Sequence, residues 1–262
     1  MTQQTSSPPE AALARPRTGR EILLVLALSL GASAVYSVIS FVDAATRSIP
    51  ISKQTAPLNP SLSDRAVFDV LYNLYGLAVD VVPVLLALYL LATPAVGALR
   101  RIGLDLTRPR FDLLTGIGLA ALIGVPGLGL YELSRALGLS LQVSTDGIGP
   151  QWYAVPILVL SALRAALQEE VIVIGYLFEK LKELRWSPWL IIGAAALLRG
   201  TYHLYQGWGG FVGNAVMGVV FGLFYRRFGR TAPLVVAHFI LDLVSFVGVA
   251  VLTVVAPGLL PK

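Results

Sequence analysis

The sequence has no cysteine, two histidines and a small share of charged residues. Without cysteine there is no disulfide, no thiolate zinc site and no cysteine nucleophile. Charged residues make up 13% of the 262 residues, about half of the roughly 25% found in ordinary soluble domains. Hydrophobic residues make up 56%, and the mean hydropathy is +0.74. These values exclude a disordered chain, a nucleic-acid-binding module and most soluble folds, and they predict a polytopic helical membrane protein.

Long apolar runs predict an all-α transmembrane bundle of about seven (six to eight) helices. We expect residues 1–20 to form a flexible cytoplasmic tail and residues 21–262 to form one transmembrane domain, whose motif-bearing half is 152–256. The first run is too long for a signal-peptide core, so we expect it to be retained, although Ala32-Ser33-Ala34 resembles a cleavage site. The expected helices are, in order, residues 22–42, 70–99, 113–131, 152–178, 188–206, 211–225 and 232–256.

The basic residues are distributed unevenly over the segments between these runs. If the N-terminus is cytoplasmic, most Lys and Arg residues fall in the tail and in cytoplasmic loops. Because cytoplasmic loops of membrane proteins carry an excess of Lys and Arg, this asymmetry predicts a cytoplasmic N-terminus and an external C-terminus. The same rule accounts for the net charge of +5 without an anionic partner. We expect an integral protein of the plasma (inner) membrane.

Eight ionisable residues fall inside the predicted helices. On the insertion scale, an Asp, Lys or Arg at the membrane centre costs at least roughly 2.5 kcal/mol. Such groups therefore face the bundle interior, pair with one another or line a water-filled cavity. They are Asp80, Arg164, Glu169, Glu170, Arg199, His203, His238 and Asp242.

Helical spacing places four of these residues in two pairs. His238 and Asp242 are four residues apart and share one helix face, as do Arg199 and His203 on an earlier helix. Imidazoles beside carboxylates can stabilise an oxyanion, bind a divalent metal or relay protons. These residue types are compatible with amide hydrolysis and with ion or proton transport.

The adjacent carboxylates Glu169 and Glu170 lie about 100° apart around a regular helix. One can therefore face a cavity while the other turns to a neighbouring helix. Burial raises the pKa of a carboxyl group toward the range of a general base. A purely structural role, such as an ion pair of Glu170 with Arg199 or Arg164, is the third interpretation of these charges.

Three short motifs in this region resemble those of the CPBP family, the CAAX-protease and bacteriocin-processing (Abi) intramembrane proteases. Glu169-Glu170-Val171-Ile172-Val173-Ile174-Gly175 resembles the Glu-Glu-x-x-x-Arg-Gly motif. Leu198-Arg199-Gly200-Thr201-Tyr202-His203 resembles the second motif, whose histidine closes a Phe-x-x-x-His pattern. His238-Phe239-Ile240-Leu241-Asp242 resembles the last motif, His-x-x-x-Asn/Asp. Residues 1–150 match only as generic membrane helices.

The resemblance implies a helical bundle with a polar intramembrane cavity open toward the cytoplasmic side. It implies an intramembrane endopeptidase that hydrolyses a peptide bond of a membrane-associated peptide or protein. In such an enzyme Glu169 activates the water, and Glu170 supports it. His203, His238 and Asp242 complete the site, either as oxyanion-stabilising groups or as metal ligands.

The cofactor and the activity remain open at this point. Both histidines with Glu169 or Asp242 form a plausible zinc set, yet the chain has no His-Glu-x-x-His motif. A metal-free glutamate mechanism is equally compatible with the sequence. The alternatives to a protease are a non-catalytic membrane protein of the same fold in immunity or secretion, and a proton- or ion-coupled transporter.

Two positions depart from the family motifs. Ile174 stands where the motif has arginine, and Arg199 stands where the second motif has phenylalanine. We hypothesise that Arg199 supplies from the fifth helix the guanidinium that the fourth helix lacks. Arg164 is expected to support the site by pairing with a glutamate or by lying near Gln168.

The remaining polar and aromatic residues are expected to have structural roles. We expect Asp80 to pack between helices or to face a loop. We expect Tyr202, Tyr205 and Trp208 to form part of an outer aromatic belt rather than to clamp a substrate.

The depth of the fifth helix raises a further expectation. A start near Pro188 would place His203 roughly 9 Å deeper than Glu169 at 1.5 Å per residue. We therefore expect the helix to start later, with residues 186–191 at the membrane interface.

If Arg199 replaces the motif arginine, Arg199→Leu should abolish whatever activity Glu169→Gln abolishes. Both changes remove a charge that the site requires. The measurement is cleavage of a membrane substrate in membranes that contain each variant. Cleavage that survives Arg199→Leu would show that the fifth helix does not supply the missing guanidinium.

Overall fold

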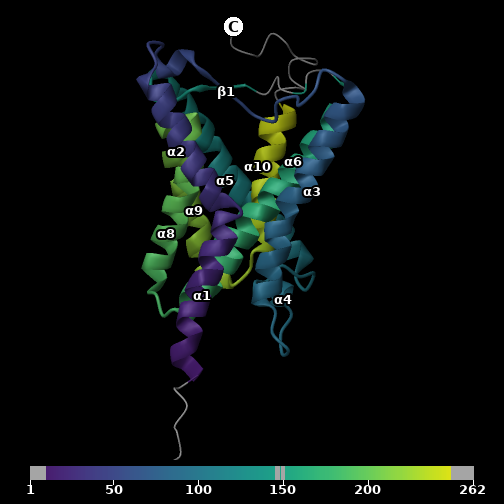
Figure 1. Cartoon of the computed structure of the whole chain (residues 1–262), viewed down its shortest axis with the longest axis vertical. Coiled ribbons are helices and arrows are strands. Elements are labelled where there is room, and N and C mark those ends of the chain that lie inside the picture. Colours follow the sequence, from purple (N-terminus) through teal and green to yellow (C-terminus); the bar gives the residue numbers. More distant parts are fainter. Residues whose placement is uncertain (1–9, 145–147, 149–150, 249–262) are drawn as a thin grey trace, which may run out of the picture.

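The computed structural model describes residues 10–144, 148 and 151–248, and this part of the chain is almost entirely helical (Figure 1). The all-α prediction is confirmed. The α-helices are α1 (Glu10–Ala27), α2 (Leu30–Thr46), α3 (Ala66–Leu91), α4 (Ala98–Arg101), α5 (Pro109–Ala136), α6 (Ala154–Glu169), α7 (Leu177–Glu183), α8 (Pro188–Tyr202), α9 (Trp208–Phe228) and α10 (Ala232–Leu243). The shorter elements are the 3₁₀ turns η1 (Ile51–Lys53) and η3 (Leu204–Gln206), the π-helices η2 (Glu170–Tyr176) and η4 (Val244–Gly248), and the strands β1 (Thr55–Pro57) and β2 (Gln142–Ser144).

Three of these helices, α3, α5 and α9, are long and apolar enough to cross a membrane. A fourth span is formed if Arg17–Ala27 and α2 are counted together, since they are joined at a bend of 52°. Ala232–Gly248 is a shorter apolar helix. A membrane protein is thus confirmed, and each of the seven predicted segments contains a helix in its described part. The last expected segment continues to residue 256, and residues 249–256 lie outside the described residues.

The first predicted helix is broken near its centre. The side-chain hydroxyl of Ser29 donates to the carbonyl of Val25 at 2.6 Å, and α2 begins at the next residue. Gly31 permits the close approach at the bend, because a Cβ there would lie 2.6 Å from the carbonyl oxygen of Leu26. Ser29 and Gly31 thus account for the bend, although the uninterrupted apolar run does not predict it.

Two segment boundaries in the structure differ from their predicted positions. α3 ends at Leu91 rather than at residue 99, because the residue before Pro94 disfavours the helical backbone. At the other end of the chain, α1 begins at Glu10, so it includes half of the segment expected to be a flexible tail.

The helix predicted over residues 152–178 extends further than expected, because α7 continues through Glu183. Lys180 is buried there and pairs with Glu21 of α1 at 3.0 Å. Lys180 and Lys182 lie in the last turn, where positive charge is favourable to a helix. The charged residues of this segment thus lie on a helix, and Lys180 contacts the neighbouring helix α1.

The later start of the fifth helix is wrong as well. α8 begins at Pro188, and the hydroxyl of Ser187 caps its first turn. Glu169 lies 14 residues from the end of α7 at Glu183, and His203 lies 15 residues from Pro188. Both residues are therefore about 21–22 Å from the ends of their helices. Because the helix ends at Glu183 rather than at residue 178, Glu169 and His203 lie at similar depths.

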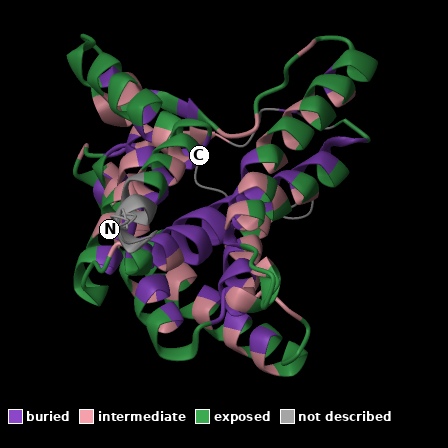
Figure 2. Ribbon diagram, turned by 60° about the horizontal axis from the view of Figure 1, so that its bottom comes forward, coloured by how far each residue is buried: buried purple, intermediate pink, exposed green. Residues whose placement is uncertain are grey.

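The core surrounds the continuous helix formed by α6, η2 and α7. All seven residues of η2 are buried, and α6 packs against α3 and α10 while α8 packs between α2 and α9 (Figure 1). Buried residues gather inside the bundle, and the outward helix faces are exposed (Figure 2). That distribution is expected of helices whose outer faces meet lipid. The motif-bearing segment is thus the best-shielded part of the protein.

Two small features close the ends of the bundle. Strands β1 and β2 pair in parallel, with Ala56 opposite Val143, and they join the loop after α2 to the loop after α5. At the opposite end, Arg230 binds both oxygens of Asp112 at 2.7 Å and one oxygen of Asp105 at 2.9 Å. The hydrogen bonds from Thr107, with help from Arg230, lower the pKa of Asp105 to about 2.

Replacing Arg230 should destabilise the protein more than replacing another arginine of the same region. Arg230→Ala leaves Asp112 buried without its cation, so we expect a loss of about 3–5 kcal/mol in the free energy of unfolding. Arg110→Ala, at an exposed position, should cost less than about 0.5 kcal/mol. Denaturant unfolding in detergent micelles measures both. Equal losses would contradict the structural role of Arg230.

Candidate active site

The two adjacent glutamates lie at a change of helix type. Glu169 is the last residue of α6, and Glu170 is the first residue of the π-helix η2. A π-helix forms i→i+5 bonds and is frequently found at functional sites. Its wider turn brings successive side chains closer in direction than the 100° of an α-helix. The structure accordingly turns both carboxylates toward a single partner, His238.

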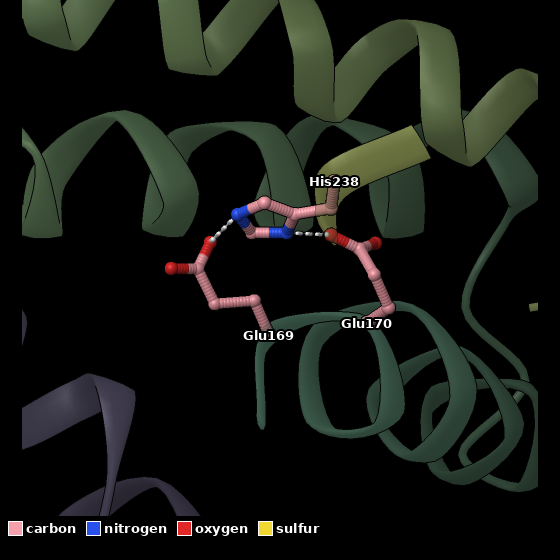
Figure 3. A group of neighbouring side chains, drawn as sticks. All are labelled: Glu169, Glu170 and His238. Atoms are coloured by element: carbon pink, nitrogen blue, oxygen red, sulfur yellow. Dashed lines mark hydrogen bonds and ion pairs between the residues drawn. The ribbon is translucent and has the colours of Figure 1, made fainter. Parts of the chain in front are cut away.

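His238 of α10 lies between the two carboxylates (Figure 3). Its Nδ1 is 2.7 Å from Oε1 of Glu170, and its Nε2 is 3.9 Å from Oε2 of Glu169. Because a carboxylate can only accept, Nδ1 donates to Glu170. On the Nε2 side, Oδ2 of Asp242 lies 3.4 Å away, as the spacing of four residues predicts.

Arg199 of α8 supplies the positive charge beside this pair. Its side chain has no exposed surface. Its Nη2 lies 2.7 Å from Oε1 of Glu170 and 3.2 Å from Oε2 of Glu169. The predicted ion pair between Glu170 and Arg199 is therefore present. Ile174, at the position of the motif arginine, is buried in η2. Among the described residues, the only guanidinium that contacts the two glutamates is therefore that of Arg199 on α8.

His203 stands at the C-terminal end of α8, where the backbone leaves the helix. Its Nε2 lies 3.7 Å from Oε2 of Glu169. Its ring lies 4.9 Å from that of Tyr202 and 6.4 Å from that of Tyr205, between centroids. Within the described part of the chain, neither ring nitrogen has a hydrogen-bond partner, and both are buried. They are free to bind a water or a substrate oxygen.

Tyr202 is a site residue that the sequence analysis assigned to the aromatic belt, and that assignment is wrong. The side chain is 5% exposed, and its hydroxyl donates to Oε2 of Glu169 at 2.7 Å. A signal was present, because Tyr202 follows Arg199 by three residues and so shares its helix face. Trp208, in contrast, is 46% exposed and packs edge-on against Phe41.

Arg164 and Asp80 form a separate pair. Nε of Arg164 lies 3.6 Å from Oδ2 of Asp80, and its Nη1 donates to Gln168 at 3.0 Å. The expected contact of Arg164 with Gln168 is present. No ion pair between Arg164 and either glutamate occurs in the described part of the structure, and Asp80 packs against α6 as expected, outside the site.

A positive charge from the protein already lies beside the residues of the predicted zinc set. Glu169, Glu170 and His238 do offer ligand atoms that all lie within 4.8 Å of one another. However, Nη2 of Arg199 lies 3.0 Å from Nδ1 of His238 and contacts both carboxylates. A guanidinium thus already provides the positive charge at this point, and Nδ1 is engaged by Glu170. Among the described residues, Oε2 of Glu170 and both ring nitrogens of His203 have no hydrogen-bond partner.

A cavity of about 420 Å³ adjoins this site. It is lined by Ala32, Ser33, Tyr36, Tyr202 and Tyr205. Tyr202 belongs both to this lining and to the hydrogen bond with Glu169. The cavity is therefore separated from the buried carboxylate by one phenol ring.

One family model matches the segment that carries this site. Residues 150–244 match the family model described as type II CAAX prenyl endopeptidase Rce1-like. The matched segment contains all three motifs, and it confirms the resemblance to the CPBP and CAAX proteases. No curated protein and no solved structure matches the chain.

The hydroxyl of Tyr202 should contribute measurably to stability. Tyr202→Phe removes a buried hydrogen bond to a carboxylate and should lower the free energy of unfolding by about 1.5–3 kcal/mol. Tyr205→Phe is the matched control, since its hydroxyl accepts only from the neutral amide of Gln206. That change should cost about 0.5–1.5 kcal/mol. Thermal unfolding in micelles distinguishes the two, and an equal effect would exclude a special role for the Glu169 contact.

Proposed function

We propose that this protein is an intramembrane endopeptidase that hydrolyses a peptide bond with a water activated by Glu169. The supporting observation is the convergence of residues from α6, α8 and α10 on one buried carboxylate. Two imidazoles, a guanidinium and a phenol all lie within 3.9 Å of Oε2 of Glu169. The match of residues 150–244 to a protease family supports the same activity.

In the proposed reaction, Glu169 takes a proton from a water near His203. The water oxygen bonds to the carbonyl carbon of the substrate, and the carbonyl oxygen becomes an oxyanion. His203 and His238 stabilise this oxyanion by hydrogen bonding. The C–N bond then breaks, and the departing nitrogen receives the proton from Glu169. The products are an amine and a carboxylic acid, which releases its proton to water.

The other polar residues position these groups. Glu170 is fully buried and holds both Arg199 and His238. Asp242 lies beside Nε2 of His238 and orients the ring. Arg199 balances the charge of the two carboxylates, so that Glu169 can stay ionised inside the membrane. In several hydrolases two neighbouring carboxylates have different roles, because their surroundings differ.

We propose that the hydrolysis needs no metal. The charge that a cation would supply comes from Arg199, whose Nη2 lies among the three candidate ligands. The earlier proposal of a zinc set that includes His203 and Asp242 is less well supported by this geometry. Chelation should therefore leave the activity unchanged.

The substrate is proposed to be a membrane-associated peptide or protein, cut within or at the edge of the bilayer. The protein is proposed to lie in the plasma (inner) membrane with its N-terminus in the cytoplasm and its C-terminus outside. The N-terminal end of α1 and the arginines of α4 lie at one end of the bundle, and β1 lies at the other (Figure 1). This arrangement agrees with the distribution of basic residues in the sequence.

The test uses membranes of cells that express Glu169→Gln, which retain uncleaved substrates. Detergent-solubilised membranes are incubated with purified protein, and new N-termini are labelled and identified by mass spectrometry. The native protein should generate new termini, with and without a chelator. Glu169→Gln and His203→Ala should generate them at a rate lower on the order of a thousandfold or more, as expected when a general base or an oxyanion donor is lost.

Glu132→Gln is the matched control, since it changes an exposed glutamate on α5 outside the site. It should cleave like the native protein. New termini produced at the full rate by Glu169→Gln would disprove the proposed function. Loss of cleavage on chelation would disprove only its metal-free form.

A further inference from the structure

The cavity beside Tyr202 is bounded by one side chain of the site and by exposed positions of α2. Its inner wall is Tyr202, whose hydroxyl binds Glu169. Its outer wall is the first two turns of α2, where Tyr36 is 70% exposed. A group that entered from the lipid side of α2 would therefore meet the phenol that contacts the proposed base.

The chemistry of the lining is mainly apolar. Ala32 and Ser33 are small, and the three tyrosines present ring surfaces. The hydroxyl of Tyr202 is engaged by Glu169, and that of Tyr205 accepts from Gln206 at 2.9 Å. The lining thus favours an apolar occupant over a charged one. Its volume of about 420 Å³ lies at the lower end of the roughly 300–1,000 Å³ typical of ligand sites.

The wall formed by α2 is held in place next to the site. The hydroxyl of Ser37, one residue beyond Tyr36, accepts a hydrogen bond from the backbone N–H of Tyr205 at 2.6 Å. One turn further, Phe41 packs against Trp208 at 5.5 Å between ring centroids. The bend before Leu30 lets this half of the helix take its own direction. The cavity is therefore a feature of the packed structure.

We propose that this cavity is the specificity pocket of the enzyme and receives an apolar side chain next to the scissile bond of a membrane-embedded substrate. Ala32, Ser33 and Tyr36 set its width, and Tyr202 connects it to the base. The occupant is a substrate side chain because the pocket adjoins Glu169 and reaches the lipid-facing surface. The inference rests on the proposed function, since it assigns the substrate contacts of that same site.

The test uses the absence of cysteine from the chain. A single cysteine is introduced as Ala32→Cys, and the purified, folded protein is alkylated with N-benzylmaleimide. Val38→Cys is the matched control, because residue 38 lies on the opposite face of α2, is 40% exposed and does not line the cavity. Because the label is added after folding, a loss of cleavage reflects a blocked pocket rather than a misfolded protein. Mass spectrometry confirms that each cysteine carries the label.

Alkylated Ala32→Cys should generate new N-termini at a rate lower by on the order of tenfold or more, because the label displaces the substrate from its reactive position. The rate is compared with that of the same variant before labelling, and alkylated Val38→Cys should cleave like the native protein. In a second measurement, Tyr36→Ala should shift the residues beside the cleaved bonds toward larger apolar side chains.

Two results would disprove the proposal that this cavity is the specificity pocket. One is full cleavage of the same bonds by alkylated Ala32→Cys. The other is failure of the thiol introduced by Ala32→Cys to react in the folded protein, which would show that nothing can enter there. Both leave the proposed function intact as long as Glu169→Gln is inactive. Full activity of Glu169→Gln would instead disprove the proposed function itself.

Discussion

A buried charge in a lipid-embedded bundle is tolerated only where another helix supplies a partner, and this requirement organises the site. The guanidinium of Arg199 has no exposed surface and contacts both Glu169 and Glu170. Leaving one member of such a set unpaired costs several kcal/mol. The pairing therefore fixes α8 against the helix that carries the glutamates, and the bond from Glu170 to His238 fixes α10 against both. The proposed chemistry depends on this charge balance before it depends on any single residue.

The two neighbouring glutamates differ in what surrounds them. Glu170 is sealed by Arg199 and His238, whereas Glu169 faces Tyr202, His203 and the cavity beside α2. The change from α-helix to π-helix between them allows both to contribute to one centre without sharing one environment. A regular helix would direct one of them away from His238. Local backbone geometry thus determines which carboxylate can reach a substrate.

The sequence predicts the bundle and, because polar groups are rare in its apolar runs, six residues that the structure brings together: Glu169, Glu170, Arg199, His203, His238 and Asp242. Burial forces Glu169, His203 and the other charges inward, and the spacing of four residues aligns them. The π-helix could not be predicted, since it depends on tertiary packing around η2. Tyr202 was misassigned because a tyrosine in an apolar run suits the lipid interface as well as a buried contact. The burial of Lys180 could not be predicted from local pattern, since its partner Glu21 lies 159 residues away.

The order of the helices in the chain has a consequence for biosynthesis. Glu170 precedes Arg199 by 29 residues and His238 by 68 residues. A nascent chain that has inserted only α6 and η2 holds two carboxylates in lipid without either partner. The charge of these carboxylates is balanced only when α8 arrives with Arg199. The centre of the proposed hydrolysis is complete only when α10 joins, so we expect a partly inserted chain to be inactive.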